Sequence, residues 1–337
     1  MTRRAVVLMN LGGPDSPEAV RPFLYNLFSD PAIIRLPAPL RLPLAALIAS
    51  RRAPAARRIY AQLGGASPLL ANTQAQARAL EGELGNREPG VAHRCFVAMR
   101  YWRPPTPVTV SEAKTWSPDE IVLLPLYPQF STTTTQSSLA AWSREARRQR
   151  LDVPTRSIRS YPAASGFTAA LAALTRDALD AAEIEAAQAD PRPVRLLLSA
   201  HGLPEKIVKA GDPYPREVAT TAAALLRALD WPGIDSVVCY QSRVGPLAWI
   251  GPSVEEELRR AARDRVGVVV VPISFVSEHS ETLVELDRDY RRFAERIGVP
   301  FYRRVPTVGA DPRFIAALAD LVRGVSADPG AARATAA

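Results

Sequence analysis

Short apolar runs alternate with amphipathic stretches along the whole chain of 337 residues. Strands that are covered by helices on both faces are expected to be apolar nearly throughout. Six runs have this character, three in each half of the chain: 5–11, 95–101, 120–126, 194–200, 236–240 and 266–273. Apolar strands separated by helices predict an α/β protein with parallel sheets.

Two helical stretches begin with the spacing of a capping box, in which residues three apart cap each other's backbone N–H groups. They are Asp15 with Glu18, before a helix expected at 19–28, and Ser253 with Glu256, before a helix expected at 258–265. Each helix would follow one of the predicted strands, which agrees with the α/β pattern.

The two halves of the chain resemble each other where their third strands end. The sequences LLPLY at 123–127 and VVPIS at 270–274 both run from a strand into a proline. This echo predicts two similar doubly wound domains that face a cleft. The expected domains are 1–160 and 161–325, and the tail at 326–337, which is rich in Ala, Gly and Pro, is expected to be disordered.

The positive charge of the chain is concentrated in one segment. The 42 basic residues exceed the 34 acidic ones by eight, and seven of these charges lie in 31–80, which contains no Asp or Glu. The segment is also rich in Leu and Ile. Mixed cationic and apolar surface suits a membrane interface or an amphiphilic anion better than a nucleic-acid backbone. The alternative is an ordinary helix with a solvated arginine face.

The apolar runs and the cysteines indicate the cellular context. No run approaches the roughly 18 residues that are needed to span a bilayer. The run after Arg3 and Arg4 is also too short for a secretory signal, so a soluble intracellular protein is expected. Cys95 and Cys239 fall in strand-like runs without a C-x-x-C pair, which predicts buried free thiols.

Two of the three histidines lie where chemistry is expected, because ligands of open α/β sheets bind beyond the carboxyl ends of the strands. His201 and His279 follow predicted strands, whereas His93 lies in a loop bordered by Pro and Gly. A lone histidine is more often structural than catalytic. The positions of His201 and His279 make them candidates and leave His93 incidental.

Carboxylates close to His279 strengthen this site. Glu281, Glu285 and Asp289 recur at i, i+4 and i+8, so a helix would place them along one face. Together with a histidine they could bind a divalent ion such as ferrous iron or zinc. The alternative is a solvated face neutralised by nearby arginines: Arg288, Arg291 and Arg292.

Trp249, in the sequence PLAWIGP, could line a flat apolar pocket, although core packing is the commoner role of a tryptophan.

Taken together, the motifs resemble those of the ferrochelatase family. The matching stretches occur in the family's order over nearly the whole chain: LMNLGGPDSPEAV (8–20), YAQLGGASPL (60–69), LPLYPQFSTTTTQSS (124–138), LSAHGLPEKIVKAGDPYP (198–215), YQSRVGPLAWIGPS (240–253) and VPISFVSEHSETLVELD (271–287). The resemblance implies two Rossmann-like domains, each with a parallel four-stranded sheet, which enclose a porphyrin cleft as in class II chelatases.

The resemblance also implies an activity and residues for it. The activity is the insertion of ferrous iron into protoporphyrin IX, with release of two protons, which makes protohaem in the last step of haem biosynthesis. His201 and Glu281 would bind iron and deprotonate the pyrroles. Glu278 and His279 would assist catalysis, and Glu285 and Asp289 would form a relay for protons or cations.

Further residues would bind the porphyrin. Arg100 and Tyr101 match an Arg–Tyr pair on the opposite wall of the cleft, and Ser67 matches a residue near the propionates. Arg51 and Arg52 match basic residues on a lip, at about 31–58, at the mouth of the cleft. Leu11 and Trp249 are also expected to contact the ring.

No permanently bound cofactor is expected, because ferrous iron is a substrate. Some family members hold an iron–sulfur cluster with four cysteines near the C-terminus, but this chain has two cysteines, and none after Cys239. The expected partners are a porphyrin, ferrous iron and, by peripheral contact, a membrane surface, with no nucleic acid. The expected location is the cytoplasm, with peripheral association with the inner membrane.

Two alternatives stay open at this point. One is a chelatase for another tetrapyrrole or metal, acting on coproporphyrin III or sirohydrochlorin. The other is a two-lobed protein that binds a tetrapyrrole or a metal without catalysis.

Overall fold

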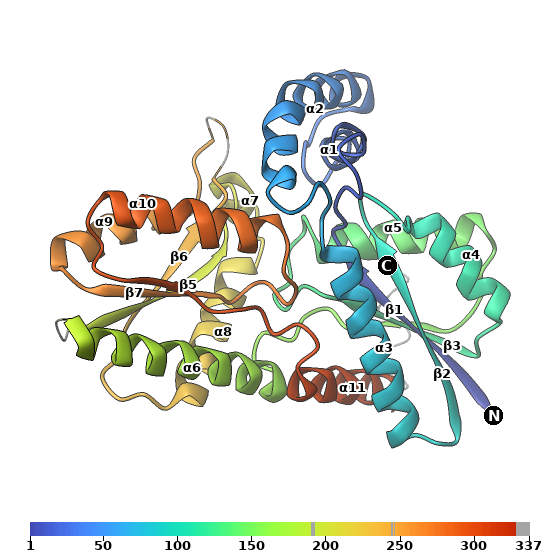
Figure 1. Cartoon of the computed structure of the whole chain (residues 1–337). Coiled ribbons are helices and arrows are strands. Elements are labelled where there is room, and N and C mark those ends of the chain that lie inside the picture. Colours follow the sequence, from blue (N-terminus) through green and yellow to red (C-terminus); the bar gives the residue numbers. More distant parts are fainter. Residues whose placement is uncertain (190–192, 244, 246, 328–337) are drawn as a thin grey trace. The chain divides into compact units, whose positions relative to one another are not determined.

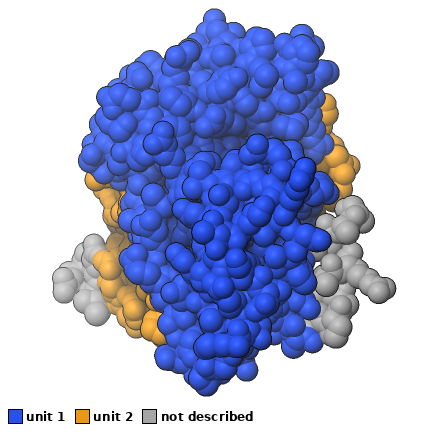
Figure 2. Space-filling model, turned by 90° about the vertical axis from the view of Figure 1, so that its right-hand side faces the viewer, with its two compact units in different colours: residues 1–160, 315–337 blue, residues 161–314 orange. Residues whose placement is uncertain are grey.

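The computed structural model describes residues 1–189, 193–243, 245 and 247–327. These residues form two compact units, which Figure 2 distinguishes by colour: unit 1 comprises 1–160 and the chain from 315 onward, and unit 2 comprises 161–314. The expected C-terminal domain, 161–325, differs from this division at its end. The helix that begins there belongs with unit 1, where Asp320 forms an ion pair with Arg87 at 2.6 Å.

Unit 1 contains a parallel four-stranded sheet in the order β2-β1-β3-β4 (Figure 1). Its strands are β1 (Thr2–Asn10), β2 (Val91–Met99), β3 (Glu120–Pro125) and β4 (Thr155–Ser157). Its helices are α1 (Val20–Phe28), α2 (Ala38–Ala61), α3 (Leu69–Arg87), α4 (Thr106–Trp116), α5 (Thr135–Arg148) and most of α11 (Pro312–Ala327).

Unit 2 contains a second parallel sheet with the equivalent order β6-β5-β7-β8. Its strands are β5 (Val194–His201), β6 (Asp235–Gln241), β7 (Gly267–Pro272) and β8 (Tyr302–Arg304). Its helices are α6 (Ser165–Ala189), α7 (Glu205–Lys209), α8 (Tyr214–Leu229), α9 (Val254–Asp264), a π-helix η1 (Glu281–Asp289) and α10 (Tyr290–Arg296).

The central strands are apolar because helices cover both faces of each sheet (Figure 1). In unit 1, α4 and α5 pack on one face around Val7, Leu123 and Trp142, and α3 packs against β1 and β2. In unit 2, α9, η1 and α10 pack on one face around Leu197 and Val270, while α6 and α8 are paired with each other in the same unit. The prediction of doubly wound parallel sheets is therefore confirmed.

The repeated strand-to-proline motif occupies the same place in both sheets. Pro125 ends β3 opposite Met9 of β1, and Pro272 ends β7 opposite Ser199 of β5. The next residue in each case donates its N–H to the central strand, Leu126 to the Met9 carbonyl at 2.8 Å and Ile273 to the Ser199 carbonyl at 2.9 Å. The motif thus marks the carboxyl edge of each sheet, and the two domains are confirmed as similar.

One of the two predicted capping boxes exists. The Ser253 hydroxyl accepts the Glu256 N–H at 3.2 Å, and the Glu256 carboxylate accepts the Ser253 N–H at 2.6 Å. The box at Asp15 and Glu18 is wrong, because α1 begins only at Val20 and its N-cap residue is Ala19. There the Ser16 hydroxyl accepts the Ala19 N–H instead, at 3.2 Å.

The sequence pattern missed two of the edge strands, β4 and β8. Each has three residues, which is too few for a period to be recognised. From residue 328 onward, the tail that was expected to be disordered lies outside the described residues.

Candidate active site

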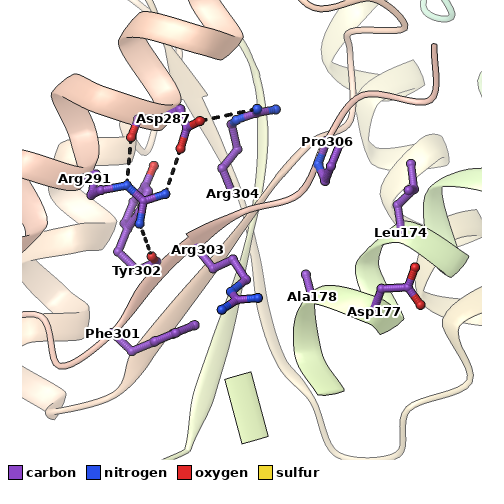
Figure 3. A pocket seen from close by; sticks show the side chains of 10 residues that line it. All are labelled: Leu174, Asp177, Ala178, Asp287, Arg291, Phe301, Tyr302, Arg303, Arg304 and Pro306. Carbon is purple, nitrogen blue, oxygen red and sulfur yellow. Dashed lines mark hydrogen bonds and ion pairs between the residues drawn. The ribbon is translucent and has the colours of Figure 1, made fainter. Parts of the chain in front are cut away.

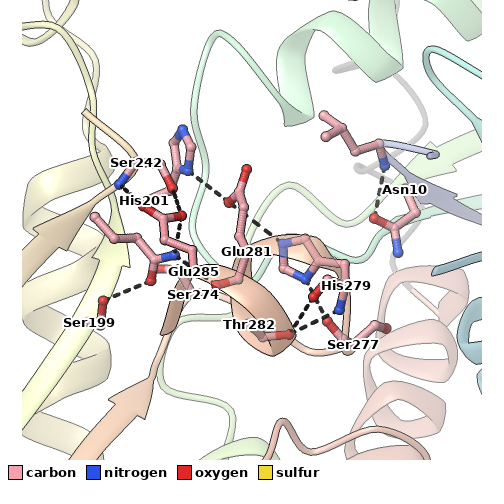
Figure 4. A network of polar contacts seen from close by, with 12 residues as sticks. Asn10, Ser199, His201, Ser242, Ser274, Ser277, His279, Glu281, Thr282 and Glu285 are labelled. Carbon is pink, nitrogen blue, oxygen red and sulfur yellow. Dashed lines mark hydrogen bonds and ion pairs between the residues drawn. The ribbon is translucent and has the colours of Figure 1, made fainter. Parts of the chain in front are cut away.

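A histidine–carboxylate pair lies at the carboxyl edge of the sheet in unit 2 (Figure 4). His201 is the last residue of β5, and Glu281 is the first residue of η1. The His201 Nδ1 and a Glu281 carboxylate oxygen are 3.0 Å apart. The carboxylate can only accept, so Nδ1 carries the hydrogen of the neutral ring and Nε2 keeps a free lone pair. His201 is thereby oriented as a base or a metal ligand.

His279 approaches Glu281 from the other side (Figure 4). Its Nε2 is 3.6 Å from the carboxylate oxygen that contacts His201. Its Nδ1 is 3.0 Å from the Ser277 carbonyl, which can only accept, so Nδ1 donates there. Glu281 therefore lies between two imidazoles and can stabilise a proton on either of them.

The pair is electrostatically coupled. Burial opposes protonation of the His201 imidazole, but the adjacent Glu281 carboxylate outweighs it, so the pKa of His201 lies above its ordinary value. Burial likewise opposes ionisation of Glu281, but His201 and His279 outweigh it and hold the pKa of Glu281 well below its usual range. At neutral pH the carboxylate is ionised and ready for a cation or a proton.

This coupling predicts a measurable titration. In the metal-free protein, the pKa of His201 is expected to lie above the 6.5 of a free imidazole. It should be lower in Glu281→Gln than in the unaltered protein, because the adjacent carboxylate is lost while burial still opposes protonation. Imidazole NMR resonances followed across pH measure both values. The raised pKa of His201 therefore contributes stability that is complete below pH 6.5 and is lost as pH rises through the raised value. An unchanged His201 pKa in Glu281→Gln would contradict this coupling.

The strand ends are locked together behind the pair. Gln241, fully buried at the end of β6, accepts the Ser199 hydroxyl at 2.8 Å and donates to the Glu281 carbonyl at 3.4 Å and the Glu285 carboxylate at 3.3 Å. Gly202 turns the chain directly after His201, where a Cβ would lie 2.7 Å from the Gln241 carbonyl. The turn after His201 therefore requires glycine.

Glu285 is held beside the pair by the π-helix. It accepts the Ser242 N–H at 2.8 Å, the Ser242 hydroxyl at 2.5 Å and the Tyr290 hydroxyl at 3.2 Å. Burial and the nearby charge of Glu281 raise its pKa. Such a carboxyl group keeps its proton to a higher pH than an ordinary glutamate does, and it can pass that proton on.

The predicted stripe of three carboxylates is only partly present. Gln241 donates to the backbone carbonyl of Glu281 and to the carboxylate of Glu285, and the Glu281 and Glu285 carboxylates interact electrostatically, but Asp289 is exposed. The segment winds as a π-helix with i→i+5 bonds, so the regular i, i+4, i+8 line of an α-helix does not apply. Arg291 pairs with Asp287 at 2.7 Å and not with the stripe.

Glu278 makes contacts of a different kind. Its carboxylate accepts Nη1 of Arg304 at 2.9 Å and the Thr307 N–H at 3.0 Å. Arg304 also approaches Asp287, at 3.5 Å, and lines a cavity of about 500 Å³ in unit 2, which contains neither His201 nor Glu281 (Figure 3). These contacts anchor the loop before η1, and a catalytic role of Glu278 stays a prediction.

A second polar cluster lies in unit 1 and surrounds a residue that the sequence analysis missed. Asp30 is buried and accepts four hydrogen bonds: Nη2 of Arg100 at 2.7 Å, the Tyr101 hydroxyl at 2.7 Å, the Ser137 hydroxyl at 2.5 Å and the Ala32 N–H at 2.8 Å. Burial opposes its ionisation, but these donors lower its pKa. Asp30 therefore orients the predicted Arg100–Tyr101 pair.

The sequence carried only weak signals for Asp30 and Ser137. Asp30 is the last acidic residue before the acid-free segment 31–80, and Ser137 lies in a hydroxyl-rich run. Neither signal predicts that the side chain is hydrogen-bonded to Arg100, which lies in a different part of the chain.

The remaining predicted porphyrin-binding residues of unit 1 lie on two features. Leu11 packs beside Tyr101 in a core cluster. Ser67 packs directly against Gly13. A side chain on Gly13 would bring its Cβ to 2.5 Å from the Ser67 hydroxyl, so glycine at this position leaves room for Ser67. Arg51 and Arg52 are exposed on α2.

Trp249 is half-buried in unit 2 and borders the turn that follows His201. Its ring would lie 3.2 Å from a Cβ on Gly202. Its buried indole N–H has no hydrogen-bond partner among the described residues.

His93 and the two cysteines lie outside the site. His93 does not lie in a loop, because β2 begins earlier than its apolar run and includes this residue. Its side chain is buried, and its Nε2 lies 3.4 Å from the Glu88 carboxylate. Cys95 is only half-buried, since β2 is an edge strand, whereas Cys239 is fully buried as expected. Burial raises the pKa of both thiols.

The fold is similar to that of a chelatase of known structure. The chain can be superposed on SirB, the sirohydrochlorin chelatase of Bacillus subtilis subspecies spizizenii solved with cobalt, with a TM-score of 0.55 over 98% of this chain and 97% of that chain, at 12% identity. This likeness shows the fold alone, which is that of a class II chelatase.

Sequence similarity identifies the family of the chain more specifically than the fold does. The ferrochelatase family model matches residues 3–325. The chain is 52% identical to the ferrochelatase of Caulobacter vibrioides over 98% of this chain and 93% of that protein. It is 53% identical to that of Phenylobacterium zucineum over 97% of this chain and 93% of that protein. The chain belongs to the ferrochelatase family.

Proposed function

We propose that His201 and Glu281 carry the central chemistry of a ferrochelatase that inserts ferrous iron into protoporphyrin IX. The products are protohaem and two protons, and the enzyme is a lyase. The observation that supports these roles is the 3.0 Å contact between His201 Nδ1 and Glu281 at the carboxyl edge of the unit 2 sheet. It leaves one basic nitrogen and one carboxylate available for protons and iron.

The two residues have complementary tasks. Pyrrole protons must leave as iron enters, and the free Nε2 of His201 is a suitable acceptor. Glu281 stabilises the resulting imidazolium and provides an oxygen ligand for iron. A two-donor site holds a divalent ion weakly enough to release it to the porphyrin. Glu285 and His279 then offer the next positions for a proton.

Porphyrin binding would use both apolar and cationic side chains. Trp249 and Leu11 offer apolar contact to the ring. Arg51, Arg52 and Ser67 would bind propionates through charge-assisted hydrogen bonds. Arg100 and Tyr101, fixed by Asp30, would also contact the ring.

Neither a resident cofactor nor an iron–sulfur cluster is part of this proposal, because the chain's two cysteines are too few for a four-cysteine site. His and carboxylate ligands discriminate poorly among divalent ions, so zinc or cobalt should also be inserted in vitro.

A direct assay tests the function. Purified protein is mixed anaerobically with ferrous iron and, in parallel, with protoporphyrin IX, coproporphyrin III or sirohydrochlorin, and the absorption bands are followed. Metallation of protoporphyrin IX with multiple turnovers is expected. Turnover only with another tetrapyrrole, or binding without metallation, would overturn the proposal in favour of a different chelatase or a binding protein.

The segment with the excess positive charge forms an amphipathic surface in unit 1. Ala45, Ala49 and Ala53 of α2 are buried against the core, while large apolar side chains of the same segment are exposed: Leu36, Leu40, Leu42 and Leu47. Arg51 lies eleven residues after Leu40, on the same helical face. Among the described helices, none is long and apolar enough to cross a membrane. These features support a cytoplasmic enzyme that binds peripherally to the inner membrane.

The double variant Leu40→Glu/Leu47→Glu is expected to bind anionic phospholipid vesicles at least about tenfold more weakly than the unaltered protein, because apolar insertion is lost and negative charge is added. Vesicle co-sedimentation measures this. Val108→Glu, which replaces an exposed apolar residue on α4, is the matched control and should bind normally. Equal binding by the double variant and the control would contradict the assignment.

A further inference from the structure

Tyr290 bridges two carboxyl groups that belong to different helices. It is the first residue of α10, and its ring is buried in the core beside Cys239, Val254 and Leu258. Its hydroxyl oxygen lies 3.2 Å from Oε1 of Glu285 in η1 and 3.2 Å from Oε1 of Glu255 in the first turn of α9. Glu255 is half-exposed at the surface of unit 2.

This geometry requires more than one proton. A tyrosine hydroxyl has a single hydrogen and can donate to only one carboxylate, whereas its lone pairs can accept from a protonated carboxyl. Both contacts are hydrogen bonds only when one of the two carboxyls carries a proton. Glu285, Tyr290 and Glu255 therefore form a chain in which one shared proton can occupy either end.

The charges around the chain allow this proton to move. Neither Glu285 nor Glu255 forms an ion pair with a lysine or arginine among the residues that the structure describes. A protonated His201 is a cation that faces Glu285. Of the other acids in the first turn of α9, Glu256 pairs with Arg243 at 3.4 Å and Glu257 pairs with Arg260 at 3.3 Å. From η1, Glu281 faces Glu285, and from β6 the Cys239 thiol faces Glu255 and Glu257.

We infer that Tyr290 and Glu255 form the outer arm of a proton route that runs from His201 and Glu281 through Glu285 to the surface at α9. In each transfer, Glu285 gives its proton to the Tyr290 oxygen while the Tyr290 hydrogen passes to Glu255. The net change is a carboxylic acid at Glu255 and a carboxylate at Glu285, with Tyr290 unchanged. Glu255 then releases the proton to water. The inference rests on the proposed function, because pyrrole protons are the ones carried.

Tyr290→Phe tests the route, because it removes the bridging oxygen and keeps the buried ring. Its kcat for metallation of protoporphyrin IX is expected to fall about tenfold, with KM for porphyrin and metal unchanged, and its solvent deuterium isotope effect on kcat should rise. Tyr302→Phe is the matched control, since the Tyr302 hydroxyl lies in the same core but donates to the Leu286 carbonyl. It should show neither change.

A second pair of variants guards against a purely structural effect. Glu255→Gln, at the surface, should reproduce the loss of kcat, while Glu257→Gln on the same helix should not. The double variant Tyr290→Phe/Glu255→Gln should lose no more than either single variant, because both interrupt one route. If Tyr290→Phe does not fold, Glu255→Gln carries the test.

The outcomes separate the two claims. A normal kcat and isotope effect in both Tyr290→Phe and Glu255→Gln would overturn the route while the metallation by unaltered protein still supports the function. Additive losses in the double variant would also overturn the route. Absence of metallation by the unaltered protein would overturn the proposed function, and this inference with it.

Discussion

His201→Ala is expected to lower the rate of ferrous iron insertion by at least about a hundredfold, while protoporphyrin binding changes by less than about threefold. The variant removes the free Nε2, which we propose as the acceptor of the pyrrole proton, and leaves Glu281 without its partner at 3.0 Å. The residues that are proposed to bind the porphyrin are unchanged in this variant. The loss should therefore appear in kcat and not in the affinity for the ring.

Anaerobic stopped-flow absorbance measures metallation, and quenching of porphyrin fluorescence measures binding. The His201 side chain is 41% exposed, so added imidazole should reach the vacated space and restore part of the activity. Glu281→Gln should show a comparable loss. Its matched control is Glu205→Gln on α7, because Glu205 contacts the exposed Lys209 at 2.7 Å and should be dispensable for metallation. Near-normal turnover by His201→Ala would refute the assignment.

Asp30→Ala is expected to lower the free energy of unfolding by about 3 kcal/mol, because it leaves the Arg100 guanidinium, the Tyr101 hydroxyl and the Ser137 hydroxyl without their shared acceptor inside unit 1. Denaturant unfolding monitored by circular dichroism measures the change. The matched control is Asp119→Ala, whose carboxylate accepts an exposed backbone N–H from Arg3 and should cost less than about 1 kcal/mol.

The Asp30 effect should also depend on pH. The native interactions lower the pKa of Asp30 below the ordinary 3.8, so its contribution to stability is complete above that value and is lost as pH falls through the lowered native pKa. The difference between unaltered protein and Asp30→Ala should therefore shrink in acid. A loss equal to that of Asp119→Ala at neutral pH would show that the cluster does not stabilise unit 1.

Local patterns in the sequence were sufficient for the main elements. The six long strands lie within a few residues of their apolar runs, because full burial between helices imposes an unbroken apolar pattern. The capping box at Ser253 and Glu256 was readable because both partners lie within one turn. The box at Asp15 and Glu18 shows the limit of such a pattern, since the same spacing occurs where the helix begins later.

The candidate site was only partly readable. Histidines after strands were noticeable because parallel strands end at one edge of a sheet, and the structure brings His201 and Glu281 together there across 80 positions of sequence. The sequence did not predict that 281–289 forms a π-helix. Because of this winding, Asp289 is exposed and does not continue the line of Glu281 and Glu285. The resemblance to the family's motifs identified the candidate site residues, but it could not show which of their side chains are in contact.

The sequence by itself therefore determined the α/β class, the two similar halves, the family and the acid-free cationic segment, because each depends on composition or on residues within a few turns of one another. Only the tertiary structure decided that Asp30 holds Arg100 and Tyr101, that Glu278 faces Arg304, and that Tyr290 joins Glu285 to Glu255. These contacts join side chains from different elements. Their existence depends on how the elements pack, and no local period or spacing records that packing.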